Sequence, residues 1–360
     1  MKLPPLRLSF LSIAIAAACG STSLRSEDVA ALDYDAVLDP GGAVCSTSAA
    51  GRPPLLEALV LAQASETRPF PVLPMRAADG AVPLYDNLGT LTLPVGTSSA
   101  RAQAYFDQGL RWAFAFNHAE AQRAFQAAQR EDPELAMAHW GEAFVLGPNI
   151  NAPMLPEAVA PAVAALARAL ELAPAAPAKD RALIAALQKR YSADPGAERA
   201  ALDAAFADAM GAVAKDYPDD DTLQTLYAES IMDTQPWDYW EAAGTQPKGR
   251  AGEMLAILEK VLARNPEHPG AIHLYLHAVE ASVSPERGLP HARRLAALMP
   301  GAGHIVHMPA HIYYRTGLFK ESLETNKRAM AVDEAYFAGS PSDPLYKAAY
   351  YPHNIHFVLV

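Results

Sequence analysis

The chain has 360 residues, of which 51% are hydrophobic and 19% are charged, so it can bury a core and is not a disordered polypeptide. Its formal net charge of −11 and the lack of any cluster of Lys and Arg exclude the positively charged surface that binds nucleic acid. Alanine dominates the long segments between glycines and prolines, which favours helix over strand.

The first residues have the features of a signal peptide. Lys2 and Arg7 carry positive charge, and Leu8 to Ala18 form an apolar run that ends in small residues. This run is too short to span a bilayer as a helix. We therefore expect residues 1–18 to direct export.

Cys19 follows small residues directly, and this arrangement resembles the site at which bacterial lipoproteins are cleaved and lipidated, although Ala16 stands where a larger aliphatic residue is usual. The alternative is ordinary cleavage after Ala18. These outcomes predict an outer-membrane lipoprotein, anchored in the membrane through Cys19, or a periplasmic protein. Cys45 is the only other cysteine in the sequence, so a lipidated Cys19 leaves it without a disulfide partner.

Residues 19–97 contain mixed Ser, Pro, Gly and acidic residues and show weak periodicity. We interpret most of them as a poorly structured tether and an N-terminal wrapping segment. A short strand pair between Leu84 and Leu93 is a further possibility that their alternation allows.

From Ser98 onward, hydrophobic residues recur at helical spacing and stop at regularly placed prolines. In five segments, three residues on one helical stripe are followed five residues later by a proline, which cannot continue the helix. The five sets are Ala121-Phe125-Ala128-Pro133, Ala162-Leu166-Ala169-Pro174, Phe206-Met210-Val213-Pro218, Met254-Leu258-Val261-Pro266 and Gly288-Ala292-Leu295-Pro300.

Tyr105, Gly109 and Trp112 precede the first stripe and supply a partner helix, in which Gly109 permits close approach. With that stripe they resemble the tetratricopeptide repeat, a helix–turn–helix unit of 34 residues. Gln108 departs from the pattern, because the family prefers an aliphatic residue there. The resemblance implies an all-α solenoid, a right-handed superhelix, over residues 98–360. Its concave groove would bind a protein, peptide or small-molecule ligand.

The prolines that end the five stripes lie 41, 44, 48 and 34 residues apart, so the earlier units carry insertions. The expected insertions are Gly147 to Pro153 and Thr234 to Gly249. Trp237 in the second insertion either forms a lid over the groove or covers a helix end. Several phrases, such as His307 to His311, are also similar to an uncharacterised bacterial family of exported repeat lipoproteins, and this similarity implies no established reaction. The apolar end at Val360 is a poor cap, which suggests a truncated product or part of a longer protein.

Seven histidines follow Ala271, and several of them are spaced for joint ligation of a metal. Histidines three or four residues apart share one face of a helix, and both the first and the second members of two such pairs lie 34 residues apart, in matching slots of successive repeats. The resemblance implies that these slots face the concave groove, and Glu229 occupies an equivalent slot one repeat earlier. The candidate ligands are His273, His277, His304, His307, His311, His353, His356 and Glu229.

Imidazole and carboxylate ligands without thiolate favour zinc, copper, iron or nickel over calcium or magnesium, so the sequence predicts one or two transition-metal ions. The segment His273 to His277 is not the H-E-x-x-H motif of zinc proteases, because it lacks the glutamate after the first histidine. Glu229 or Glu280 would have to replace that base. In the alternative interpretation, the histidines pack between aromatic side chains. His118, His139, His268 and His291 are outside the matched slots, and we assign them structural roles.

Three functions remain open at this stage. The first is a cell-envelope protein whose groove binds a ligand or partner, with a histidine-bound metal at the C-terminal end. The second is a metal-dependent oxidoreductase or hydrolase that uses the same site through an open coordination position. The third is an interaction scaffold in which the histidines are structural. The sequence contains no phosphate-binding loop, dinucleotide fingerprint, serine-hydrolase elbow or haem-attachment motif.

Overall fold

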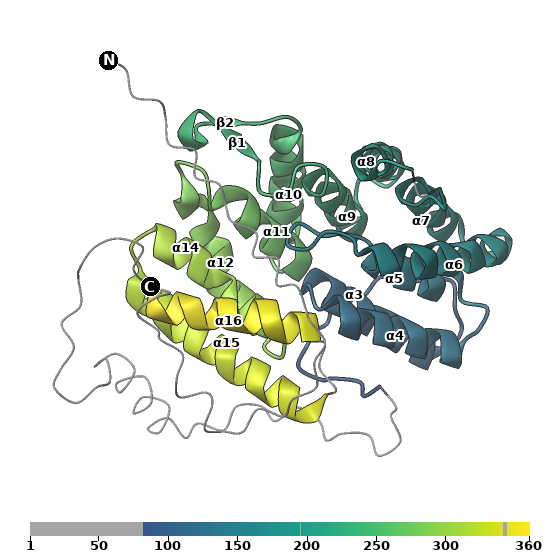
Figure 1. Cartoon of the computed structure of the whole chain (residues 1–360), viewed down its shortest axis with the longest axis horizontal. Helices are drawn as coiled ribbons and strands as arrows, with labels where there is room; N and C mark the ends of the chain where they lie inside the picture. Colours follow the sequence, from purple (N-terminus) through teal and green to yellow (C-terminus); the bar gives the residue numbers. More distant parts are fainter. Residues whose placement is uncertain (1–81, 195, 341–343) are drawn as a thin grey trace, which may run out of the picture. The chain divides into compact units, whose positions relative to one another are not determined.

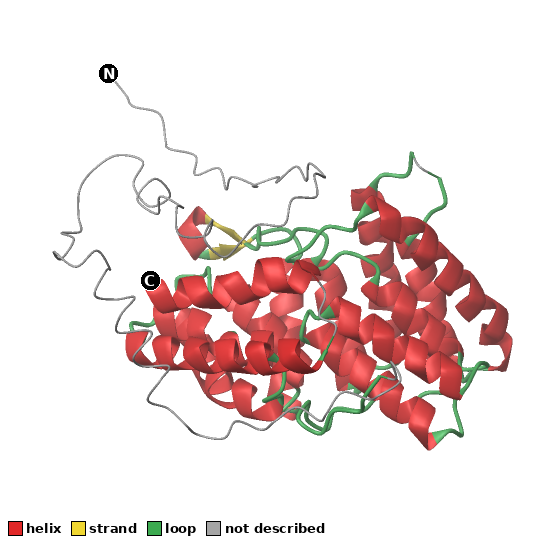
Figure 2. Cartoon of the chain, turned by 60° about the horizontal axis from the view of Figure 1, so that its bottom comes forward, coloured by secondary structure: helices red, strands yellow, loops and turns green. Residues whose placement is uncertain are grey.

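A computed structural model of the chain describes residues 82–194, 196–340 and 344–360, and these residues are almost entirely helical (Figures 1 and 2). They all belong to the compact unit Pro69–Val360. The expectation of an all-α chain is confirmed for the described residues. The signal peptide, Cys19 and residues 19–81 of the expected tether lie outside them.

The helices follow one another as neighbouring, packed pairs along the chain. Their bounds are α3 (Ala100–Phe114), α4 (His118–Glu131), α5 (Ala136–Val145), α6 (Pro156–Leu172), α7 (Ala178–Leu187), α8 (Arg199–Asp216), α9 (Asp221–Met232), α10 (Ala251–Arg264), α11 (Pro269–Val279), α12 (Leu289–Leu298), α13 (Gly303–His307), α14 (Pro309–Arg315), α15 (Phe319–Gly339) and α16 (Pro344–Leu359). Four 3₁₀ turns are described, η2 (Ala173–Ala175), η3 (Gln188–Arg190), η4 (Ala242–Gly244) and η5 (Pro285–Gly288). A two-residue antiparallel pair, β1 (Trp240–Glu241) and β2 (Gln246–Pro247), lies in the second predicted insertion.

The five prolines predicted to stop helices do so. Helices α4, α6, α8, α10 and α12 each end two residues before their proline. The stripe residues that precede each proline are buried, as at Phe125, Leu166 and Met254. Each of these helices therefore turns its apolar stripe towards its neighbours and leaves its charged face in solvent.

Close packing in the first helix pair depends on glycine. A Cβ atom added at Gly109 of α3 or at Gly141 of α5 would lie 2.6 Å or 2.4 Å from the ring of Phe125 on α4. The ring of Phe125 thus occupies the space between three helices. The predicted role of Gly109 in close approach is confirmed.

The segment of residues 82–97 is ordered along α3 and contains no strand, so the strand pair between Leu84 and Leu93 is wrong. Gln108 accepts a hydrogen bond from the Tyr85 amide at 2.8 Å and donates one to the Pro83 carbonyl at 2.9 Å. Asp107 accepts another from the Leu93 amide at 3.0 Å. Side chains of α3 satisfy the backbone groups that a strand pair would have satisfied, which explains the departure from the repeat pattern at Gln108.

The first and last parts of the described chain meet. Helix α3 contacts α11 and lies beside it in Figure 1. Tyr336 of α15 donates a hydrogen bond to Glu120 of α4 at 2.9 Å, and its ring lies 5.8 Å from that of Trp112. The first helix pair therefore covers the inner side of the C-terminal helices, where the resemblance to an open solenoid implied a groove.

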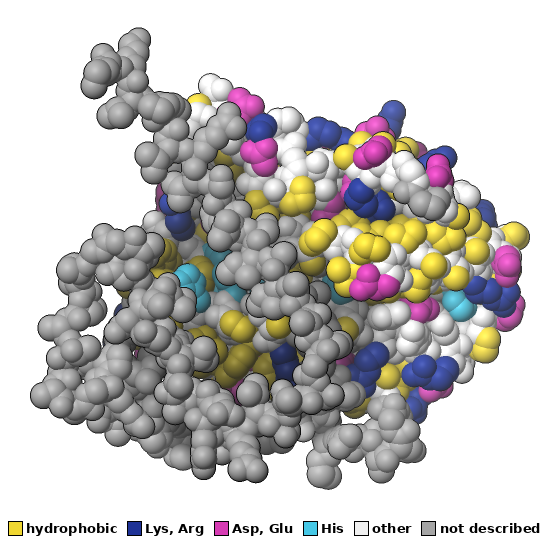
Figure 3. Space-filling model, viewed as in Figure 1, with side chains coloured by type: hydrophobic (Ala, Val, Ile, Leu, Met, Phe, Trp, Pro, Cys, Tyr) yellow, Lys and Arg dark blue, Asp and Glu magenta, His cyan; other side chains and the backbone are white. Residues whose placement is uncertain are grey.

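One described stretch, Pro156–Ala175, is long and apolar enough to span a membrane by length and composition alone, with a hydropathy of 1.4 in its most apolar window. Hydrophobic side chains cover the surface in the region of α6 in Figure 3. Helix α6 packs against α5, and a single stretch of this kind is weak evidence for a membrane span.

Candidate metal centre

Six of the predicted ligands form two clusters of three. The first triad consists of His273 and His277 on α11 and His304 on α13. The second triad consists of His307 on α13, His311 on α14 and His353 on α16. Within each triad, one nitrogen from each ring lies within 4.8 Å of the other two.

The first triad is buried and its rings meet through Nε2. The Nε2 atom of His273 lies 3.1 Å from Nε2 of His304 and 3.1 Å from Nε2 of His277. On the other side of the ring, Nδ1 of His273 lies 2.6 Å from the backbone carbonyl oxygen of Phe114. Because a carbonyl only accepts, Nδ1 of His273 carries the proton, and its Nε2 presents a lone pair to the centre of the triad.

The second triad repeats this arrangement. The Nε2 atom of His311 lies 2.8 Å from Nε2 of His307 and 3.3 Å from Nε2 of His353. The Nδ1 atom of His307 lies 2.5 Å from Oδ1 of Asn326, whose amide nitrogen donates to the Ser322 carbonyl at 2.8 Å and so fixes the orientation of the amide. His307 therefore donates from Nδ1 and leaves Nε2 unprotonated.

His311 is held by a carboxylate. Its Nδ1 lies 2.6 Å from Oε2 of Glu280, the residue that follows α11. A carboxylate oxygen favours the tautomer with the proton on Nδ1. The Nε2 atoms of neutral His307 and His311 then face each other with lone pairs at 2.8 Å. Such a contact is repulsive unless a cation, either a metal ion or one added proton, accepts both lone pairs.

Burial keeps most of these rings neutral at pH 7. Desolvation lowers the pKa of His273 to about 3 and that of His353 to about 4. The pKa values of His277, His304 and His307 are held well below the ordinary value by the same burial and, secondarily, by the neighbouring histidines. Neutral imidazole is the form that binds metal.

The two triads are copies of one pattern. Each contains two histidines four residues apart on one repeat and a third from the next repeat. The third histidine stands three residues before the position that matches the first member of the pair. His304 precedes His307 by three residues, as His353 precedes His356. The sequence predicted these spacings, and the structure shows that they divide the ligands between two sites.

Two predicted ligands lie outside both triads, and we correct their assignment. His356 is exposed, and the position four residues later is Val360, so the pair that would form a further triad is incomplete. Glu229 is buried in α9, where burial and, next, Asp233 raise its pKa to about 8, opposed by Arg190. The carboxylate that meets a triad is Glu280, named in the sequence only as a possible base.

Phe116 covers the first triad and was not predicted from the sequence. Its ring lies 4.5 Å from that of His273 and is stacked on those of His277 and His304, at 5.9 Å and 5.6 Å between centroids. Its backbone adopts φ 55°, a conformation that costs energy for a residue with a side chain. The strained turn between α3 and α4 thus aims an aromatic ring at the histidines.

A cavity of about 240 Å³ opens onto both triads. Its walls include His277 and His304 from the first triad and His311 and His353 from the second. The insertions predicted from the proline spacing supply Asn151, Ala152 and Trp237, and α16 supplies Ala349 and Tyr350. Trp237 is 44% exposed and its ring lies 5.0 Å from that of His277. The indole borders the cavity as the lid interpretation expected.

The buried Arg190 anchors the first insertion. It donates hydrogen bonds to the Pro148 carbonyl at 2.8 Å and to Asp233 at 2.6 Å. Asn149 closes the loop through paired backbone hydrogen bonds with Ala152, and its side chain lies 3.3 Å from Nε2 of His118. His118 therefore helps to position the loop that borders the cavity.

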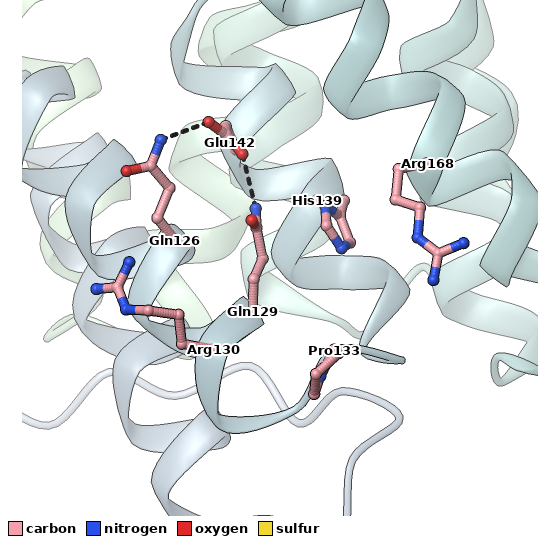
Figure 4. A pocket seen from close by; sticks show the side chains of 7 residues that line it. All are labelled: Gln126, Gln129, Arg130, Pro133, His139, Glu142 and Arg168. Atoms are coloured by element: carbon pink, nitrogen blue, oxygen red, sulfur yellow. Dashed lines mark hydrogen bonds between the residues drawn. The ribbon is translucent and has the colours of Figure 1, made fainter.

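The other three histidines assigned structural roles also lie outside both triads. His268 caps α11, accepting a hydrogen bond from the Ala271 amide at 3.1 Å, and His291 packs edge-on against Tyr275. His139 lines a separate cavity of about 520 Å³ between α4, α5 and α6. Figure 4 shows that Glu142 in this cavity accepts hydrogen bonds from the amides of Gln126 and Gln129, each at 2.7 Å.

No protein-family model and no curated protein matches this sequence.

Proposed function

We propose that this chain binds two transition-metal ions, one in each histidine triad. The observation that carries the proposal is the pair of Nε2 atoms of His307 and His311, 2.8 Å apart, with both Nδ1 atoms directed at oxygen atoms. Three imidazoles per ion leave a coordination position open, as in catalytic rather than structural zinc sites. Zinc, copper and iron are the candidate ions, because all three accept imidazole nitrogen.

We further propose that the protein acts in the cell envelope as a tetratricopeptide-like, right-handed repeat. The signal-like residues 1–18 and Cys19 support export and lipid anchoring. The 34-residue spacing of His273 and His307, and the helix ends before the five prolines, support the repeat.

The cavity that opens onto both triads is the proposed ligand site, in place of an open groove for a peptide or protein. Its volume of about 240 Å³ suits a small molecule. Since four histidines from the two triads line it, a ligand there meets both metal positions at once. This observation favours the metal-dependent enzyme as the second candidate function.

The experiment that tests metal binding compares the full-length chain with histidine variants after growth in metal-replete medium. We expect two ions per chain in the wild type and one in the His307→Ala/His311→Ala double variant, since the first triad keeps all its ligands. Metal content is measured by mass spectrometry after dialysis. Added metal should raise the melting temperature of the metal-free wild type, because a ligand at 1,000 times its Kd stabilises the folded state by about 4 kcal/mol.

His353→Ala and His356→Ala form a matched pair on α16, since one residue belongs to the second triad and the other is exposed. We expect the first change to remove one ion and the second to remove none. Trace metal in the wild type, with no rise in melting temperature on adding zinc, copper or iron, would leave the extra proton as the cation between His307 and His311. Equal loss from the two variants would show that adventitious surface sites hold the metal.

A further inference from the structure

The two triads are close enough to act as one centre. The rings of His304 and His307 lie 5.9 Å apart and are stacked, and those of His277 and His311 are also 5.9 Å apart. His304 and His307 belong to the same short helix, α13, and each serves a different triad. A single turn of helix therefore fixes the two metal positions relative to one another.

The ligand set carries little negative charge. Among the described residues, the two three-residue groups contain histidine alone, and Glu280 meets the second triad only through the far nitrogen of His311. Two divalent ions held by six neutral imidazoles would place four positive charges in a buried site, which is costly without a counter-charge. Monovalent ions reduce this cost, and an anion bound between two divalent ions offsets it.

Copper meets these requirements best among the candidates. It binds imidazole, stands at the top of the affinity order for divalent ions at nitrogen sites, and is stable in both the +1 and +2 states. The cavity gives a small ligand access to both ions at once, because it is lined by two histidines from each triad.

On the basis of the proposed function, we infer that the two triads form one binuclear copper centre that binds dioxygen between the two ions. Each Cu(I) gives one electron to dioxygen, one O–O π bond is broken, and the product is a peroxide dianion that bridges two Cu(II) ions. The O–O σ bond remains and no proton is consumed. Return of the two electrons to copper releases dioxygen. The bridging dianion supplies the negative charge that the protein ligands lack.

The test uses the full-length chain loaded without oxygen with two equivalents of Cu(I) and then exposed to dioxygen. We expect uptake of one dioxygen per two copper ions and a new near-ultraviolet absorption band from peroxide bound to Cu(II). Since a bridging peroxide couples the two unpaired spins, the oxygenated protein should give an electron paramagnetic resonance signal far below two spins per chain. Removal of dioxygen under vacuum should reverse the band.

The variants on α16 sharpen this test. His353→Ala should retain one copper and lose all dioxygen uptake rather than half of it, because one Cu(I) supplies one electron. His356→Ala should behave as the wild type. Two bound copper ions that give two full spins, without uptake of dioxygen, would overturn the binuclear centre while leaving metal binding intact. Copper that fails to bind at all would instead overturn the proposed function.

Discussion

At the scale of single residues, each triad depends on which nitrogen of its imidazoles carries the proton. Phe114, Asn326 and Glu280 hold the Nδ1 side of His273, His307 and His311. Each of these partners is remote in sequence from at least one member of the triad it serves. The spacing of histidines indicates the ligands, whereas the groups that orient them depend on packing between helices.

Removal of the acceptor at Asn326 should weaken the second site. In Asn326→Leu, Nδ1 of His307 loses its partner, so the tautomer that ligates metal is no longer favoured, and affinity at the second triad should fall by about 10-fold to 100-fold. Asn326→Asp keeps an oxygen acceptor and is the matched control. Competition with a chelator of known affinity measures both. Equal affinities in Asn326→Leu and the wild type would show that this hydrogen bond does not orient a ligand.

His268 makes stability sensitive to pH at the start of α11. Its Nδ1 accepts from the Ala271 amide, its Nε2 lies 3.2 Å from the Thr222 hydroxyl, and burial lowers its pKa to about 4. The unfolded chain takes up the proton near pH 6.5, before the folded chain does. The free energy of unfolding should therefore fall by about 3 kcal/mol from this group as pH drops from about 6.5 to about 4.

The matched variant for this prediction is His268→Asn, which keeps a side-chain oxygen to cap the helix but does not titrate. Urea unfolding of both metal-free proteins between pH 7 and pH 4 isolates the contribution of His268 from those of the other histidines. The two curves should converge as pH falls. Parallel curves would contradict the assignment of this pKa.

At the scale of elements, the sequence predicts helices better than it predicts their neighbours. The five helix ends before prolines follow from local chemistry, and so does the close approach at Gly109. The division of the histidines into two triads could not be derived from slots alone, because His304 ligates with α11 rather than with the helix turn that follows it. His356 shares the spacing but lacks a partner four residues later, where Val360 stands.

Helix α13 is the element on which both triads depend. A Cβ atom at Gly303 would lie 1.9 Å from Oδ1 of Asp333, which accepts hydrogen bonds from Tyr346 at 3.0 Å and Asn354 at 2.8 Å. Gly303→Ala should therefore push α13 away from α15 and α16. We expect a loss of about 1–3 kcal/mol in stability and reduced metal content at both triads.

Gly339→Ala on α15 is the control for Gly303→Ala, since nothing lies within 4 Å of the position of its Cβ atom. Its stability should stay within about 0.5 kcal/mol of the wild type. Thermal unfolding and metal analysis measure both variants. A Gly303→Ala protein that holds two ions would show that α13 can shift without disturbing its histidines.

At the scale of the whole described body, the first helix pair completes the first triad from a distance. The carbonyl of Phe114 and the ring of Phe116 come from the turn after α3, and they reach α11 because α4 is held against α15. No local pattern in the sequence indicates this closure. The resemblance to open repeats implied a groove at the position that these residues cover.

The contact between α4 and α15 should contribute measurably to stability. Tyr336→Phe removes one donor from the buried Glu120, which also accepts from Ser340 at 2.7 Å, so unfolding in urea should become easier by about 1.5–3 kcal/mol. Tyr351→Phe is the control, because Tyr351 donates to Glu334 at an exposed position. An equal effect of both changes would contradict a special role for the closing contact.

The central claim is that each histidine triad holds a metal ion, and anomalous diffraction from crystals of the metal-loaded full-length chain tests it most directly. We expect two anomalous peaks, each about 2.0–2.1 Å from the Nε2 atoms of its three histidines, with Glu229 and His356 away from both. Crystals that take up no metal, with His307 and His311 joined Nε2 to Nε2 through one added proton, would contradict it.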